Sequence, residues 1–257
     1  MGERLERTLE AAELKGRLSL EQLLILGFLA GAYIGFGALL SLVAASGWHP
    51  GFGLERLAMG AAFSLGLILV VGAGAELFTG NCLLVTANCS GRLCGRATLR
   101  NWGWVYLANL AGSVFLAAVV YLAGLHLAFE PAGLARKALE IARAKATLPF
   151  WTAFWRGVLC NWLVCLAVWM AAGTRDFAGK VLAVFFPVLA FVAMGFEHSV
   201  ANMFFIPYGL FLSTVPLPGL DLRAFLVGNL LPVTLGNLAG GAFFVGFLYH
   251  RAESAGH

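Results

Sequence analysis

Six apolar stretches, each long enough to cross a membrane as a helix, take up most of this chain of 257 residues. A helix that spans a bilayer needs about 20 consecutive apolar residues. The stretches lie at about 21–45, 58–90, 101–125, 151–172, 181–213 and 225–249. Charged residues make up 12% of the chain, well below their share in soluble domains. The sequence therefore predicts an all-α membrane protein with six transmembrane helices, of which the second and fifth stretches are too long for one plain helix.

The ends of the chain differ from the apolar stretches. Residues 1–18 place charged side chains between apolar ones at helical spacing. This pattern predicts an amphipathic helix on the inner surface of the membrane, although a solvated helix has the same pattern. Residues 19–250 then form the membrane domain, and residues 251–257 form a short cytoplasmic tail.

Basic residues lie in the connections between apolar stretches, which explains the formal charge of +4 without a nucleic acid partner. With six spans, ten Lys and Arg residues fall on the side of both termini and seven fall on the other side. Cytoplasmic connections carry the excess of basic residues in membrane proteins. We therefore expect a multi-pass protein of the cell inner (plasma) membrane with both termini in the cytoplasm.

Two sequence units occur twice in the chain. The unit NWGWVYLANLAG of the third stretch recurs 128 residues later as NLLPVTLGNLAG in the sixth. The unit GAELFTGN, which holds Glu76 and Asn81, recurs 121 residues later as GFEHSVAN, which holds Glu197 and Asn202. Three spans separate the copies, so equivalent points have opposite orientations in the membrane. The chain is therefore predicted to be an inverted repeat of about 21–125 and 151–249, an architecture common among transporters.

Both overlong stretches carry the unit with the glutamate, so we expect each helix to be broken there. Broken backbone inside a membrane is tolerated only where it is buried in protein or lines a cavity. Glu76 and Glu197 can accept hydrogen bonds from backbone N–H groups and polar side chains at the break, with Asn81 and Asn202 beside them. A role for the carboxylates in carrying protons is the alternative.

His198 occurs in only one of the two repeats, because LFT of the first unit is replaced by HSV in the second. An ionisable side chain inside a membrane segment is a functional candidate by default, and a buried structural histidine is the alternative. An intramembrane enzyme is disfavoured, since Glu-His is not the zinc-binding His-Glu-x-x-His arrangement and no phosphate-binding loop occurs. We expect no metal and no cofactor.

Four runs carry a family likeness: FSLGLILVVGAGAELFTGN, GVLCNWLVCLAVWMA, FVAMGFEHSVANMFFIP and NLLPVTLGNLAGG. Together they resemble the formate/nitrite transporter family, over about residues 20–248. The resemblance implies a homopentamer of aquaporin-like, six-span protomers, each with its own pore for small monovalent anions and their conjugate acids. Formate is the favoured substrate, and nitrite or hydrosulfide are the alternatives.

The same resemblance implies roles for single residues. Thr79 and His198 would form the polar pair at the centre of the pore, and Lys145 would draw anions to the outer mouth. The other implied positions line the pore or its two apolar constrictions. They are Asn161 and Glu197 near the pore, Leu67 with Phe191 at one constriction, and Phe78 with Val164 at the other. Without the resemblance, Leu67, Val164 and Phe191 read as core residues and Lys145 as part of a surface helix.

A mechanism follows from the cost of moving an anion. Taking a bare carboxylate through an apolar constriction costs far more than thermal energy, and loss of water raises its proton affinity. His198 has an ordinary pKa near the physiological range, so it can donate a proton or stabilise the anion, while Thr79 holds the other oxygen. An open channel and a proton-coupled carrier share these residues, and mobility of the segment 77–82 would decide whether pH gates the pore.

Overall fold

The computed structural model describes residues 2–47, 51–128 and 133–254, and these residues form helices and loops with no β-strand. The predicted all-α class is therefore confirmed. The helices are α1 (Glu3–Gly16), α2 (Leu20–Ala45), α3 (Phe52–Ala73), η1 (Gly80–Leu83), α4 (Leu84–Cys89), α5 (Gly95–Leu122), α6 (Leu125–Ala128), α7 (Leu134–Ala146), α8 (Phe150–Ala172), α9 (Phe177–Ala193), α10 (Ser199–Leu212), η2 (Ala224–Leu230), α11 (Leu231–Leu238), η3 (Ala239–Phe247) and α12 (Leu248–Ser254).

Several helices are long and apolar enough to cross a membrane. By length and composition, five helical stretches among the described residues qualify: α2, α3, α5, α8 and the continuous run Ala224–Ser254. The apolar helices α9 and α10 are shorter, and together they account for the overlong stretch 181–213. Most of the expected membrane segments thus correspond to single long helices.

The two overlong stretches each contain a non-helical segment between two helices. Helix α3 ends at Ala73, and the chain stays non-helical until η1 begins at Gly80. Helix α9 ends at Ala193, and α10 begins at Ser199. Gly74 directly follows α3 with a φ angle of 71°, and Gly195 lies two residues after the end of α9 with a φ angle of 74°. Such positive φ angles end helices, and side chains with a Cβ rarely adopt them.

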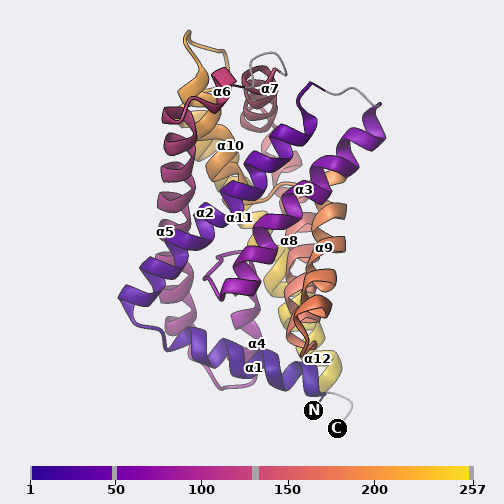
Figure 1. Cartoon of the computed structure of the whole chain (residues 1–257). Helices are drawn as coiled ribbons and strands as arrows, with labels where there is room; N and C mark the ends of the chain where they lie inside the picture. The colour runs from indigo at the N-terminus through magenta and orange to yellow at the C-terminus, as the bar shows by residue number, and fades with distance from the viewer. Residues whose placement is uncertain (1, 48–50, 129–132, 255–257) are drawn as a thin grey trace.

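Helices α1 and α7, which precede α2 and α8 in the two halves of the chain, lie at opposite ends of the bundle (Figure 1). Helix α1 runs across the lower end of the bundle beside α12, and α7 lies at the upper end. In the first half α2 packs closely on α5, and in the second half α8 packs on α11. A Cβ atom at Gly112 would overlap the carbonyl oxygen of Phe28, and one at Gly240 would overlap that of Val158. These equivalent glycines let the helices of each half approach to backbone contact.

Helix α1 has the predicted amphipathic character, but its apolar face packs against protein. Leu5, Leu9 and Ala12 are buried in a cluster that includes Leu84 of α4 and Trp169 of α8. We expected this face to meet the membrane surface or to belong to a solvated helix. The difference arises because the sequence pattern records only that one face is apolar, and the ends of α4 and α8 offer it a protein surface.

Replacing Gly112 tests the close approach of α2 and α5. Gly112→Ala should lower the Tm of the detergent-solubilised protein, because overpacking costs about 1–3 kcal/mol and exceeds the gain of about 1 kcal/mol from removing a helical glycine. Gly103→Ala is the matched control in the same helix, since nothing lies within 4 Å of a Cβ atom there. Equal Tm changes in the two variants would contradict the packing argument.

Candidate functional site

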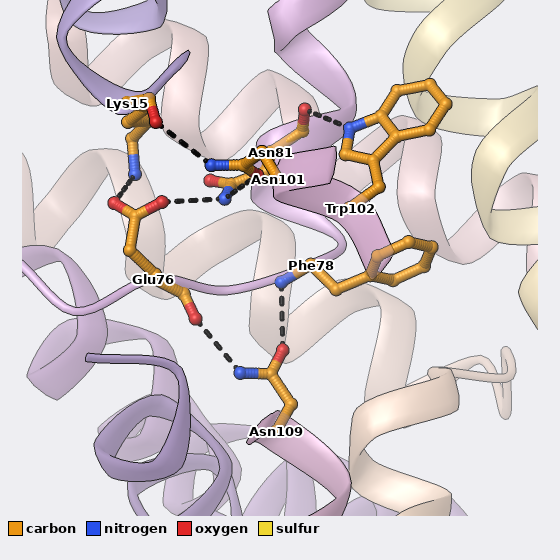
Figure 2. Close-up of polar contacts among 7 residues, drawn as sticks. All are labelled: Lys15, Glu76, Phe78, Asn81, Asn101, Trp102 and Asn109. Atoms are coloured by element: carbon orange, nitrogen blue, oxygen red, sulfur yellow. Dashed lines mark hydrogen bonds and ion pairs between the residues drawn. The ribbon is translucent and has the colours of Figure 1, made fainter. Parts of the chain in front are cut away.

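Four side chains form a closed ring of polar contacts at the first break (Figure 2). Glu76 accepts from Lys15 Nζ at 2.5 Å and from Asn81 Nδ2 at 2.7 Å, one bond to each carboxylate oxygen. Asn101 of α5 accepts from Asn81 Nδ2 at 2.9 Å and donates to the carbonyl oxygen of Lys15 at 3.1 Å. The ring joins α1, the non-helical segment, η1 and α5.

The second break holds the same ring, built from the second repeat. Glu197 accepts from Lys145 Nζ at 2.9 Å and from Asn202 Nδ2 at 2.7 Å. Asn229 accepts from Asn202 Nδ2 at 2.7 Å and donates to the carbonyl oxygen of Lys145 at 2.9 Å. The duplication seen in the sequence is therefore also a duplication of contacts, with helix α7 in the place of α1.

A second pair of asparagines, and not the glutamates, accepts hydrogen bonds from backbone N–H groups at the breaks. Asn109 Oδ1 accepts from the backbone N–H of Phe78 at 2.9 Å, and Asn237 Oδ1 accepts from that of Ser199 at 2.9 Å. We expected the carboxylates to bind backbone N–H groups, whereas the bonds found are to lysine and asparagine side chains. A carboxamide both donates and accepts, so each asparagine also donates to the carbonyl oxygen of its neighbouring glutamate.

Thr79 and His198 bring the two breaks together. Thr79 Oγ1 lies 2.9 Å from His198 Nε2, and both side chains are buried. His198 is also the N-cap of α10, because its Nδ1 accepts from the backbone N–H of Ala201 at 3.0 Å. Asn161 of α8 donates to the carbonyl oxygen of Thr79 at 3.1 Å. The polar pair is thus held from both sides by backbone contacts.

Two cavities approach this pair from opposite ends of the molecule. The Lys145 cavity, of about 140 Å³, is lined by Lys145, Glu197 and His198 among others. The Lys15 cavity, of about 340 Å³, is lined by Lys15 and Glu76 among others. Helices α7 and α1 contribute to them, and these helices lie at the upper and lower ends of the bundle in Figure 1.

The four residues expected at constrictions are all buried, and Phe191 lies against the polar pair. Leu67 lines the Lys15 cavity, and Phe191 lines the Lys145 cavity. The ring of Phe191 stacks on that of His198 with centroids 5.9 Å apart. Phe78 and Val164 are buried in the same apolar cluster as Leu67 and Phe191. Leu67 and Phe191, which we expected together at one constriction, therefore line different cavities.

Lys15 is a site residue that our reading of the sequence did not include. It takes the place in the first ring that Lys145 takes in the second, and the sequence holds a matching pattern: Lys15-Gly-Arg-Leu recurs 130 residues later as Lys145-Ala-Thr-Leu. Comparing the segments before each repeat would have found it. Among residues 2–47, 51–128 and 133–254, no three His, Cys, Asp or Glu side chains lie close enough to hold a metal ion.

Removing a lysine from its ring tests whether the ring stabilises the fold. Lys15→Met should lower the Tm, because breaking a buried ion pair costs about 3 kcal/mol or more and the Glu76 side chain is only 4% exposed. Lys15→Met with Glu76→Gln should recover most of the loss, since the amide is neutral and still accepts from Asn81. As a control, Arg7→Met removes an ion pair whose Glu3 partner is 69% exposed and should change the Tm little. Equal losses in the single and double variants would rule out the uncompensated carboxylate as the cause.

Comparison with known proteins agrees with this geometry. A family model described as formate/nitrite transporter matches residues 2–251. The chain is 46% identical to the probable formate transporter of Methanothermobacter thermautotrophicus, over 93% of this chain and 91% of that protein. It is 37% identical to the nitrite transporter NirC of Escherichia coli (strain K12), over 87% of this chain and 81% of that protein. A solved structure described as a pentameric formate channel with formate bound has a TM-score of 0.84 and 36% identity, over 91% of this chain and 98% of that one. The chain is an integral membrane protein that belongs to the formate/nitrite transporter family.

Proposed function

We propose that this protein is a channel for small monovalent weak-acid anions, with formate as its substrate. The observation that carries the proposal is a buried Thr79–His198 pair between two cavities that each contain a lysine–glutamate pair. A donor pair surrounded by apolar side chains suits a small anion with two oxygen atoms. The relatives described as a formate transporter and as a formate channel support formate, and the NirC relative keeps nitrite as the second candidate.

The arrangement in the membrane follows from the same family. We propose six spans within residues 19–250: α2, then α3 with α4, α5, α8, α9 with α10, and the part of the run Ala224–Ser254 that ends at residue 250. Helix α1 would then lie at the cytoplasmic side, together with residues 251–257 and both termini, in the plasma membrane. The related formate channel is described as pentameric, which supports a homopentamer with one pore in each protomer.

We expect an apolar route between the two cavities, and it would determine how an anion passes. A carboxylate that enters either cavity meets a positive side chain, and it then loses water as it approaches Leu67 or Phe191. Desolvation disfavours the charged form and raises its proton affinity, so a proton taken from cavity water would let the neutral acid cross the apolar route. Proton involvement therefore needs no resident acid at the centre of the pore.

The hydrogen bonds of His198 suggest which role it takes. Its Nδ1 accepts from the backbone N–H of Ala201, so this nitrogen carries no proton while the cap is intact. The neutral ring then carries its hydrogen on Nε2, which faces Thr79. A second proton on the ring would break the cap of α10. We therefore propose that His198 acts as a neutral hydrogen-bond donor that stabilises the substrate, with the Thr79 hydroxyl binding its other oxygen.

Reconstitution in liposomes tests the proposal, with formate, nitrite and hydrosulfide uptake recorded against external pH. His198→Asn is the informative variant, because asparagine is a good N-cap but lacks the imidazole. The Tm should be retained, while formate uptake should fall by about twofold to tenfold, as expected for loss of a hydrogen bond between neutral groups. Thr79→Ser should keep most of the uptake, and Thr79→Val should lose it.

Two outcomes would contradict parts of the proposal. Native uptake and an unchanged pH profile in His198→Asn would show that the histidine serves only as a cap. Faster uptake of nitrite or hydrosulfide than of formate would replace the substrate and leave the channel function in place.

A further inference from the structure

The Lys145 cavity carries more positive charge than its lysine supplies. Its charged lining residues are Arg56, Lys145, Arg156 and Glu197. Lys145 and Glu197 lie 2.9 Å apart, so their charges largely cancel at a distance. Neither arginine has a carboxylate within ion-pair distance among the described residues. Two uncompensated guanidinium groups therefore remain at this mouth.

Both arginines contact the segment that leads to His198. The guanidinium of Arg56 lies so close to Gly195 that a Cβ atom there would be 2.7 Å from Nη2. The Nε atom of Arg56 is buried without a hydrogen-bond partner in the described part of the chain. Arg156 accepts from the backbone N–H of Glu197 at 3.2 Å through its carbonyl oxygen, and it is among the residues that line the cavity.

The opposite mouth differs in charge. The Lys15 cavity is lined by Lys15, Glu76 and Lys180 as its charged residues, and the first two form an ion pair. One ammonium group is left there, against two guanidinium groups in the Lys145 cavity. The two rings are thus equivalent, but the unpaired positive charge in the cavity beside each ring differs.

We propose that Arg56 and Arg156 form an oxyanion-collecting site in the Lys145 cavity, which makes this mouth the more effective entrance. The inference rests on the proposed function and names the residues that recruit its substrate. A guanidinium offers paired N–H donors that match two oxygens of one anion. Formate and nitrite present such a pair of oxygens, and hydrosulfide does not. The site therefore favours oxyanions over hydrosulfide, beyond the general attraction of positive charge.

Variants that remove the arginine charges test whether this site attracts formate. Arg56→Gln with Arg156→Gln should lower formate flux at low formate concentration by about threefold to tenfold, since a charged cleft raises the local concentration of its ligand by about tenfold or more. Flux at saturating formate should change little. Raising the ionic strength from about 0.01 M to about 0.15 M should weaken low-concentration flux in the native chain and much less in the variant, because salt screens the attraction.

Two further variants separate the arginine site from general surface charge. Arg223→Gln removes one charge next to η2, which packs against α7. Because Arg223 does not line the cavity, the formate flux of this variant should match that of the native chain. Arg56→Lys with Arg156→Lys keeps the charge but loses the paired donors. It should retain the salt dependence and lower the ratio of formate to hydrosulfide flux at low concentration.

The outcomes separate the inference from the proposed function. A native chain that moves formate, together with a double glutamine variant of unchanged concentration dependence, would overturn the arginine site and leave the channel function intact. An equal effect of Arg223→Gln would also overturn it. A native chain that moves none of the anions would contradict the proposed function and the inference together, and the Tm of each variant shows whether it is folded.

Discussion

The ring of lysine, glutamate and two asparagines is the constraint on which the rest of this structure depends. A chain that spans a membrane has no water with which to satisfy a broken helix, and a carboxylate buried there is tolerated only when it is paired. Each ring uses both oxygens of its glutamate and closes back on the lysine backbone. Each non-helical segment is therefore bonded to neighbouring helices, and in this arrangement Thr79 Oγ1 lies 2.9 Å from His198 Nε2.

Much of this fold could be predicted from the sequence, because the relevant patterns are local. Apolar stretches gave the membrane helices, and the repeated spacing of Glu76 with Asn81 and Glu197 with Asn202 located the two non-helical segments. The meeting of Thr79 and His198 was expected from the family resemblance alone, since 119 residues separate them. No pattern within either segment indicates that they touch.

The features that could not be predicted depend on which partner a side chain selects. Glutamate and asparagine can both bind a backbone N–H, so composition does not reveal that Asn109 and Asn237 take this role. The apolar face of α1 suits a lipid surface or a protein surface equally well. Lys15 lies 61 residues before Glu76, and only a comparison of the two repeats that includes the segments before them connects the pair.

Different residues hold the backbone at the breaks and form the centre of the pore, which affects how such a pore can change over evolutionary time. The rings, Asn109 and Asn237 hold the backbone at both breaks, and of residues 77–79 they bind backbone groups: the N–H of Phe78 and the carbonyl oxygen of Leu77. The side chains at 77–79 and at 198–200 stand at equivalent places in the repeats, yet they differ at every position. The rings do not use these side chains, so those without another structural contact are open to substitution, whereas His198 also caps α10. Selection could therefore alter what the pore admits by changing a few residues at its centre, while the helices around them stay the same.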